Sequence, residues 1–276
     1  MLTNAPFHWA LLAFLVSFAS PPLNWIWKIC DFAVLTIGAL SGPFCLVIWP
    51  LLLLFWLMRR ERWSLINLAI LSPFLAIQAA KLIFGGISSR APGDLGATPM
   101  LFLRLLAGHV YVGSIWGENG FAVHAAPVAV LIVTALGTAV LIYAVCNGPL
   151  ELHFLIAFSM ILFVAALSKP LIAGPSPQWQ LLAIDPGARY WFFPMLALLW
   201  SLGFCASQKQ SKPSRILSYL AFVAMLHGVM HDRRYPPSSD KEFREFLKAF
   251  ESAPVGSWVT VPNGDGLPYL KKHGQE

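Results

Sequence analysis

Charged residues are scarce in this sequence. Only 12% of the chain is Asp, Glu, Lys or Arg, whereas soluble domains carry roughly 25%. Hydrophobic residues make up 57%, and the mean hydropathy is +0.66. A water-soluble globular domain is therefore excluded for most of the chain, and a protein embedded in lipid is favoured.

Cysteine is also rare, with 4 in 276 residues. All of them lie in or beside apolar runs, and their spacing fits neither a zinc knuckle nor a disulfide framework: Cys30, Cys45, Cys146 and Cys205. We interpret them as small buried hydrophobic residues. His227 and His231 have the i, i+4 spacing of a metal pair on one helix face, but no convincing third ligand accompanies them. We therefore expect neither a metal nor a cofactor.

Several functional motifs are missing. The chain has no Gly-rich phosphate-binding loop, no dinucleotide fingerprint and no Gly-x-Ser-x-Gly elbow, which disfavours an ATPase or a serine hydrolase. Its net charge is +6, but the basic residues are spread over loops and tail without interleaved aromatic side chains. This distribution argues against nucleic-acid binding and fits loops beside membrane spans, with membrane lipids as the partners.

Long apolar runs are what the chain has in abundance. A bilayer core of about 30 Å requires roughly 20 apolar residues per helix. The runs predict an all-α polytopic membrane protein with seven or eight transmembrane segments, at Leu2–Ala19, Asn24–Leu40, Pro43–Met58, Ser64–Phe84, Phe121–Val145, Leu150–Leu167, Tyr190–Ala206 and Ile216–His231. The second and third runs are either separate or one helix kinked at Ser41-Gly42-Pro43, because proline and glycine interrupt helices.

Basic loops predict the orientation of these segments. Two clusters should face the cytoplasm under the positive-inside rule: Arg59, Arg60 and Arg62, and Lys209, Lys212 and Arg215. An even number of predicted crossings separates the two clusters, so both assignments agree. The loops 85–119 and 168–189 then lie outside. We predict a helical body over residues 1–231 and an extracytoplasmic C-terminal tail over 232–276.

The outer loop 85–119 contains a predicted helix. Thr98 is a capping residue directly before Pro99, which suits the first helical position. Residues Met100–Trp116 then carry apolar side chains almost all round, interrupted by Arg104 and a few other polar groups. The segment is short and polar for a span. We interpret it as an interfacial helix along the outer leaflet, with a partly inserted helix as the alternative.

The tail predicts a small helix–strand unit. Residues Asp240–Ser252 carry Phe243, Phe246, Leu247 and Phe250 at i, i+3, i+4 and i+7, which forms one apolar helix face. Residues Ser257–Val261 alternate and favour a strand, and Asn263–Gly266 favours a turn. So short a unit requires support from the rest of the chain.

Two adjacent residues are the main candidates for ligand binding. Arg189 and Tyr190 stand where a predicted transmembrane helix begins, at the outer boundary. A guanidinium there can pair with a phosphate through two parallel hydrogen bonds, and a tyrosine can donate to the same group. The alternative is an ordinary interfacial anchor that reaches the lipid headgroups.

Several stretches are similar to the later half of large bacterial polytopic membrane proteins: Leu2–Trp9, Leu40–Phe44, Arg59–Trp63, Gly187–Pro194, Phe250–Ala253 and Val259–Pro262. Those proteins look like the GT-C class of glycosyltransferases, which use polyprenyl-phosphate sugars at the outer face of the inner membrane. The resemblance implies that this chain lies in a bacterial inner membrane and handles a polyprenyl-phosphate sugar. It adds Arg90 and Arg104 as weaker phosphate contacts.

One departure from that family matters. Its enzymes carry a catalytic acid just after their first transmembrane helix, and no acid here matches that position. The catalytic residues are therefore unknown. The chain resembles the C-terminal part of such a protein, inactive alone and completed by a separate N-terminal membrane subunit. The alternative is a non-enzymatic assembly or scaffold component of envelope polysaccharide synthesis.

The predicted topology can be tested by cysteine labelling. After the chain's own cysteines are replaced, Ser257→Cys should react with a membrane-impermeant thiol reagent in intact cells, because the tail is predicted outside. Ser211→Cys, in the loop predicted inside, should react only after permeabilisation. The opposite pattern would refute the orientation.

Overall fold

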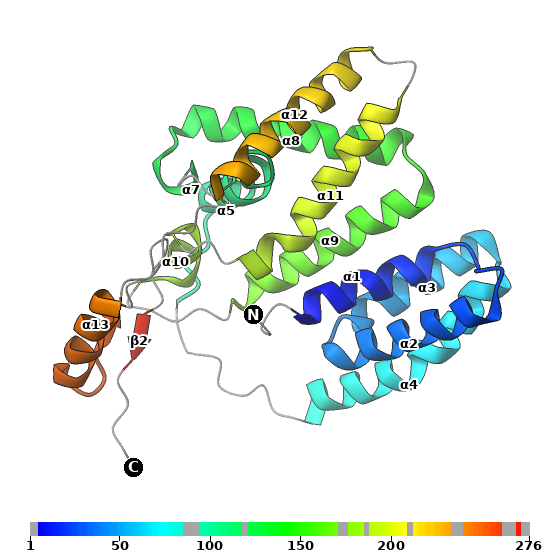
Figure 1. Ribbon diagram of the computed structural model, residues 1–276, viewed down its shortest axis with the longest axis horizontal. Coiled ribbons are helices and arrows are strands. Elements are labelled where there is room, and N and C mark those ends of the chain that lie inside the picture. The colour runs from blue at the N-terminus through cyan, green and yellow to red at the C-terminus, as the bar shows by residue number, and fades with distance from the viewer. Residues whose placement is uncertain are drawn as a thin grey trace. The chain divides into compact units, whose positions relative to one another are not determined.

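The computed structural model describes residues 5–84, 94–117, 121–170, 176–184, 188–208, 212–232, 240–260 and 269–271. These residues are predominantly α-helical, as the sequence predicted (Figure 1). The helices are α1 (Ala5–Phe18), α2 (Trp25–Ser41), α3 (Cys45–Arg59), α4 (Arg62–Phe84), α5 (Pro99–Leu105), η2 (Leu106–Val112), α6 (Gly113–Trp116), α7 (Phe121–His124), α8 (Pro127–Asn147), α9 (Leu150–Ser168), α10 (Gln178–Ile184), α11 (Ala188–Ser207), α12 (Lys212–Asp232) and α13 (Asp240–Ser252). The strands are β1 (Trp258–Thr260) and β2 (Tyr269–Lys271).

Each predicted apolar segment contains at least one helix, and these helices differ in length. Among the described residues, 4 helices are long and apolar enough to cross a membrane: Arg62–Phe84, Pro127–Asn147, Leu150–Ser168 and Tyr190–Ser207. By length and composition these make the chain a membrane protein. Three apolar helices are shorter, at Ala5–Phe18, Cys45–Arg59 and Arg215–Met230. A helix of 14 residues, such as α1, is about 21 Å long at 1.5 Å per residue, less than the roughly 30 Å of a bilayer core.

The segment predicted at Phe121–Val145 is two helices rather than one, which corrects the sequence-based expectation. The short helix α7 ends at His124, and α8 begins at Pro127. Ala126 has the extended ψ of 146°. A residue before proline avoids the helical region, and proline itself suits the first helical position, so Pro127 separates the two helices.

The second and third segments are also separate helices, which resolves the two alternatives at Ser41-Gly42-Pro43. α2 ends at Ser41 with Gly42 in an extended conformation, at φ 174° and ψ −178°. α3 does not begin until Cys45. The glycine and the proline therefore end one helix and start another.

The chain forms two compact units. The first contains residues 1–90 and 149–164, and the second contains residues 91–148 and 165–276. Helix α9 begins in the first unit, and its last residues belong to the second. The division into a body over 1–231 and a tail over 232–276 stays a prediction.

Aromatic side chains from three helices form the core of the first unit. Phe14 of α1 stacks on Phe158 of α9, with ring centroids 4.8 Å apart. Phe18 stacks on Phe154 at 5.2 Å and meets Phe55 of α3 edge to face at 5.1 Å. Such ring pairs contribute about 0.5–1.5 kcal/mol each beyond the apolar area that they bury. They join α1 and α3 to the beginning of α9.

An ion pair joins two helix ends in the same unit. Arg59, the last residue of α3, lies 2.8 Å from Glu151 in the first turn of α9, and its guanidinium also covers the ring of Phe55 at 5.0 Å. The end of α3 and the start of α9 therefore lie on one side of the unit. The orientation predicted from the basic loops requires this arrangement. One predicted segment separates the outer loop 85–119 from the short connection 147–149, so this connection is predicted inside, as is Arg59.

The cysteines are only partly buried. Cys45 and Cys205 are buried, as predicted, whereas Cys30 and Cys146 are exposed on their helices. Each cysteine is buried or exposed according to the helix face on which it lies. A helix that is apolar all round gives no sign in its sequence of which face packs against protein.

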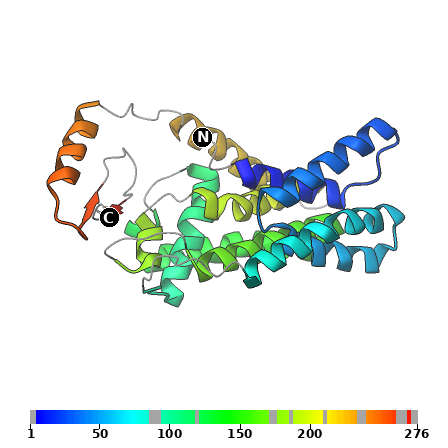
Figure 2. The same cartoon turned by 90° about the horizontal axis from the view of Figure 1, so that it is seen from below.

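The predicted outer helix lies at the centre of the second unit. α5, η2 and α6 form one continuous helix over residues 99–116, and Thr98 caps it as predicted, accepting from the backbone N–H of Leu101 at 3.2 Å. Its middle is buried, with Leu105, Ala107 and Val110 fully inaccessible. This helix runs across the direction of α8 rather than alongside it (Figures 1 and 2). An orientation along the membrane surface stays a prediction.

Glycines let neighbouring helices approach this central helix closely. A Cβ on Gly137 of α8 would lie 2.4 Å from the ring of Tyr111. A Cβ on Gly228 of α12 would lie 2.7 Å from the backbone of Trp116. Because neither glycine has a side chain, α8 and α12 pack directly against η2 and α6.

The tail contains α13 over the predicted residues, followed by a short strand. β1 pairs with β2 in antiparallel register, Val259 opposite Leu270. Phe246 on the apolar face of α13 is buried, and α13 packs against β1. The second strand was not expected from the sequence, and the predicted turn at 263–266 lies outside the described residues.

Close packing of α1 against α2 predicts a measurable effect on stability. A Cβ on Gly38 would lie 2.6 Å from the Cβ of Ala13 and 2.9 Å from the carbonyl oxygen of Trp9. Gly38→Ala should lower the free energy of unfolding by about 1–3 kcal/mol, because α1 must move away. Thermal unfolding in detergent measures this change.

Gly203→Ala is the matched control, since a Cβ on this helical glycine would meet nothing within 4 Å. It should be neutral or should stabilise α11 by up to about 1 kcal/mol, the difference in helix propensity. Equal effects of the two substitutions would contradict the packing of α1 on α2.

Candidate functional site

The two predicted outer loops meet in the second unit. The backbone N–H of Gln178 donates to the carbonyl oxygen of Asp94 at 2.9 Å, and that of Trp179 donates to Leu95 at 3.1 Å. Gln178 is buried at 8% exposed, whereas Asp94 lies at the surface. The first turn of α10 is thereby fixed to the segment that leads into α5. We call the region formed by residues 94–117, 176–184 and 188–191 the outer-loop junction.

A tight turn brings these segments together. Gly96 has a φ of +60°, in the left-handed region that favours glycine, and its N–H donates to Oδ1 of Asp94 at 3.2 Å. A Cβ on Gly96 would lie 2.4 Å from Cβ of Pro177. The position therefore requires glycine for both its conformation and its space.

Aromatic side chains complete this side of the junction. The Trp179 indole N–H donates to the carbonyl oxygen of Leu167 at 2.9 Å, near the end of α9, and its ring centroid lies 6.3 Å from that of Phe102. A shallow hollow of about 360 Å³ lies between Thr98, Phe102 and Trp179. Its walls are mostly apolar, so it can receive a flat or hydrocarbon group at the edge of the unit.

The π-helical segment η2 carries the polar side chains of His109 and Tyr111, which point in different directions. Short π-helical segments occur often at functional sites. His109 stacks on the ring of Trp191 with centroids 4.7 Å apart and planes at 6°. Trp191 follows Tyr190, whose half-buried ring lies 6.0 Å from it. Trp191 therefore lies against the central helix, and the predicted ligand-binding residue Tyr190 is next to it in α11.

Tyr111 extends from η2 in another direction. Its hydroxyl and that of Thr138 on α8 share a hydrogen bond of 3.0 Å. Burial raises the pKa of the Tyr111 phenol, while the hydrogen bond with Thr138 lowers it. Since the net pKa lies above its ordinary value, the phenol keeps its proton at neutral pH and serves as a neutral hydrogen-bonding group.

Arg104 takes a different role from the one proposed for it. Its Nη1 donates to the carbonyl oxygens of Ala122 at 3.3 Å and Val123 at 3.2 Å. These carbonyl groups belong to α7, so the guanidinium holds α7 against α5. The structure gives Arg104 a packing partner, and its contact with a phosphate stays a prediction.

The side chains of several other predicted residues lie outside the described part of the structure. Arg189 lies in the first turn of α11, and its side chain lies outside the described residues, as do Arg90 and Asp185. Asp94 is the acid of the described outer-loop junction, and its carboxylate accepts from Gly96. Within the described ranges no group of three or more His, Cys, Asp or Glu residues could hold a metal ion.

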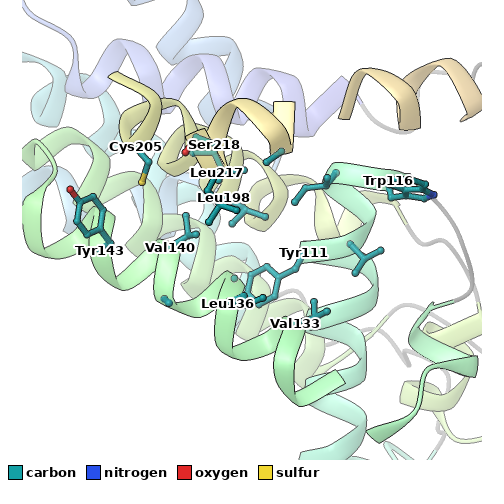
Figure 3. A pocket seen from close by; sticks show the side chains of 16 residues that line it. Tyr111, Trp116, Val133, Leu136, Val140, Tyr143, Leu198, Cys205, Leu217 and Ser218 are labelled. Atoms are coloured by element: carbon teal, nitrogen blue, oxygen red, sulfur yellow. The ribbon is translucent and has the colours of Figure 1, made fainter. Parts of the chain in front are cut away.

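A large apolar pocket in the second unit was not expected from the sequence (Figure 3). Its volume is about 570 Å³, and its walls come from η2, α6, α8, α11 and α12. Small residues are part of its walls, among them Ala139 and Ala221. In the sequence these residues resemble any small residues of an apolar helix. Only the convergence of separate helices distinguishes them.

Comparison of the chain with protein-family models, with curated proteins and with solved structures returned no match. The resemblance to glycosyltransferases therefore depends on the sequence motifs alone.

The hydrogen bond between Tyr111 and Thr138 predicts a stability difference. Tyr111→Phe should lower the free energy of unfolding by about 0.5–1.5 kcal/mol, the net contribution of one hydrogen bond. Tyr143→Phe is the matched control, because the Tyr143 hydroxyl has no hydrogen-bond partner among the described residues. Thermal unfolding of both variants in detergent measures the effect, and equal shifts would contradict a stabilising role for this bond.

Proposed function

We propose that this protein binds the phosphate of a lipid-linked sugar at its outer-loop junction. In this proposal it is the later half of a GT-C-like glycosyltransferase and is not active alone. The observation that supports it most is the connection of residues 94–95 to residues 178–179, two loops far apart in the sequence. This connection builds one structured surface beside the start of α11, where Tyr190 lies.

The proposal includes seven or eight spans in a bacterial inner membrane, with the tail outside. The four long apolar helices support the membrane location. The shorter apolar helices are counted as spans because a bilayer accommodates a short helix by local thinning. The pairing of Arg59 with Glu151 supports the orientation, because it brings two predicted cytoplasmic helix ends together.

The start of α11 supplies the proposed phosphate contact. A helix begins with unpaired N–H groups and a partial positive charge, which favours an anion. Arg189 adds a full charge and a planar fork of donors, and Tyr190 adds a hydroxyl. In sugar transfer, such a cation would neutralise the leaving phosphate while an acid elsewhere takes the proton of the acceptor hydroxyl.

In our proposal, this chain does not provide the catalytic acid for sugar transfer. Asp94 accepts from the backbone of its own turn, as a turn-forming aspartate does. We therefore propose that a separate N-terminal membrane subunit supplies the catalytic acid. The same observation on Asp94 favours the second candidate function, a non-enzymatic assembly or scaffold component of envelope polysaccharide synthesis.

Substitution of Arg189 tests the phosphate site. Arg189→Ala should weaken the binding of a polyprenyl-phosphate analogue by roughly ten- to a hundredfold, corresponding to the 1.5–3 kcal/mol of a hydrogen bond to a charged group. Arg189→Lys should keep part of the affinity, since charge survives and the planar fork is lost. Tyr190→Phe should have a smaller effect than Arg189→Ala. Titration of the purified protein in detergent measures all three.

Arg62→Ala is the control, because it removes an arginine that is predicted to lie on the opposite side of the membrane. It should leave the affinity unchanged. If Arg189→Ala binds as well as the wild type while its thermal unfolding is normal, Arg189 is a headgroup anchor and the scaffold function is favoured. Sugar transfer by the purified chain would refute the need for a second subunit, and Asp94 and Asp185 would be the first acids to substitute.

A further inference from the structure

We propose that the apolar pocket of the second unit is a binding site for one acyl chain of a bilayer phospholipid. This inference goes beyond the proposed function, because it depends on the pocket alone and assigns no role to the sugar or its phosphate. The pocket holds about 570 Å³. At roughly 30 Å³ for a group the size of a water molecule, that volume accommodates a chain of the order of 20 methylene-sized groups.

The chemistry of the walls selects hydrocarbon. Leu136 and Val140 of α8 face Leu198 of α11 and Leu217 of α12, with Tyr111 closing one side (Figure 3). Buried water requires two to four polar partners, and these aliphatic walls supply almost none. The Tyr111 hydroxyl is already shared with Thr138. Water is therefore a poor occupant, and an empty space of this size would leave the wall atoms without dispersion contacts.

The rim of the pocket is continuous with the lipid-facing surface. Leu136 and Leu217 line the pocket, yet they are 62% and 57% exposed. Beyond them, Leu131 and Ile132 of α8 and Leu220 of α12 are also more than half exposed. Helix α8 is long and apolar enough to cross a membrane, so its exposed face meets acyl chains. A chain from this surrounding phase can enter the pocket without leaving hydrocarbon.

The size of the pocket favours a single chain over a helix from another protein. An α-helix with its side chains is about 10–12 Å across and rises 5.4 Å per turn. One turn of such a helix therefore fills roughly the whole volume, which leaves too little length for stable docking. An extended acyl chain is much thinner. It contacts the central helix, α8, α11 and α12 at once.

Photocrosslinking tests the site on the unaltered protein. The full chain is reconstituted in vesicles of phosphatidylcholine whose acyl chain carries a diazirine, and is then exchanged into detergent before illumination. The pocket should retain its lipid while lipids on the open faces are diluted away. Mass spectrometry should then find crosslinks concentrated near Val140 and Ala221. Crosslinks lost uniformly from all helices would overturn the proposal.

Two valines of α8 give a matched pair of variants. Val140 lines the pocket, whereas Val145 is 43% exposed and is not part of the lining. Val140→Phe fills the site and should reduce the retained crosslinking by about tenfold, and Val145→Phe should leave it unchanged. Ala221→Phe fills the pocket from the opposite wall and should act like Val140→Phe. Thermal unfolding identifies a variant that has lost its fold, in which case the wild-type crosslink map decides.

Two further results would also overturn the proposal. Displacement of the phosphatidylcholine by an isoprenoid phosphate at equal concentration would assign the pocket to a substrate. Joining of two Val140→Cys chains by a bifunctional thiol reagent would assign it to a second copy. Arg189→Ala should leave the acyl crosslinking unchanged. Failure of the acyl-chain site and failure of the phosphate site are therefore distinguishable.

Discussion

Hydrogen bonding of the backbone in hydrocarbon is the constraint on which this structure depends. Acyl chains offer no partner to an N–H or a carbonyl group, and each unpaired group costs several kcal/mol. A helix satisfies these groups within its own segment. The long apolar runs of this chain are accordingly helices, and the described strands, β1 and β2, belong to the tail. Once the helices exist, side-chain packing decides how they associate.

The two units use different packing devices for that association. The first unit joins its helices through stacked phenylalanines, such as Phe14 on Phe158. The second unit packs helices closely on a central helix, with Gly137 against the ring of Tyr111 and Gly228 against the backbone of Trp116. Large rings fill space between helices, whereas glycines remove it. Close packing at these glycines buries the middle of the central helix, although its sequence contains Arg104 and His109.

Several polar side chains of the described residues hold helices together. Arg59 joins two helix ends through Glu151, and Arg104 joins α7 to α5 through carbonyl oxygens. The Arg59 and Glu151 side chains are 38% and 39% exposed, so water weakens their attraction and the pair mainly positions the two helix ends. The proposed phosphate contact at the start of α11 and the proposed acyl-chain pocket lie in the same unit. They nevertheless depend on different residues and on different physical forces.

The sequence by itself determined the helical class, the membrane location and several helix ends. Local chemistry sets these features: Thr98 caps the outer helix, and the apolar spacing in the tail defines α13. At Ser41-Gly42-Pro43 the sequence left two alternatives, and the structure showed two separate helices. Pro127 was an equally local signal for the break between α7 and α8, although the apolar run around it concealed the boundary. Only the tertiary structure decided which faces are buried, why Arg104 turns to α7, and where the pocket forms. These features arise when helices distant in the sequence converge, and an apolar helix carries no local mark of the face that will meet them.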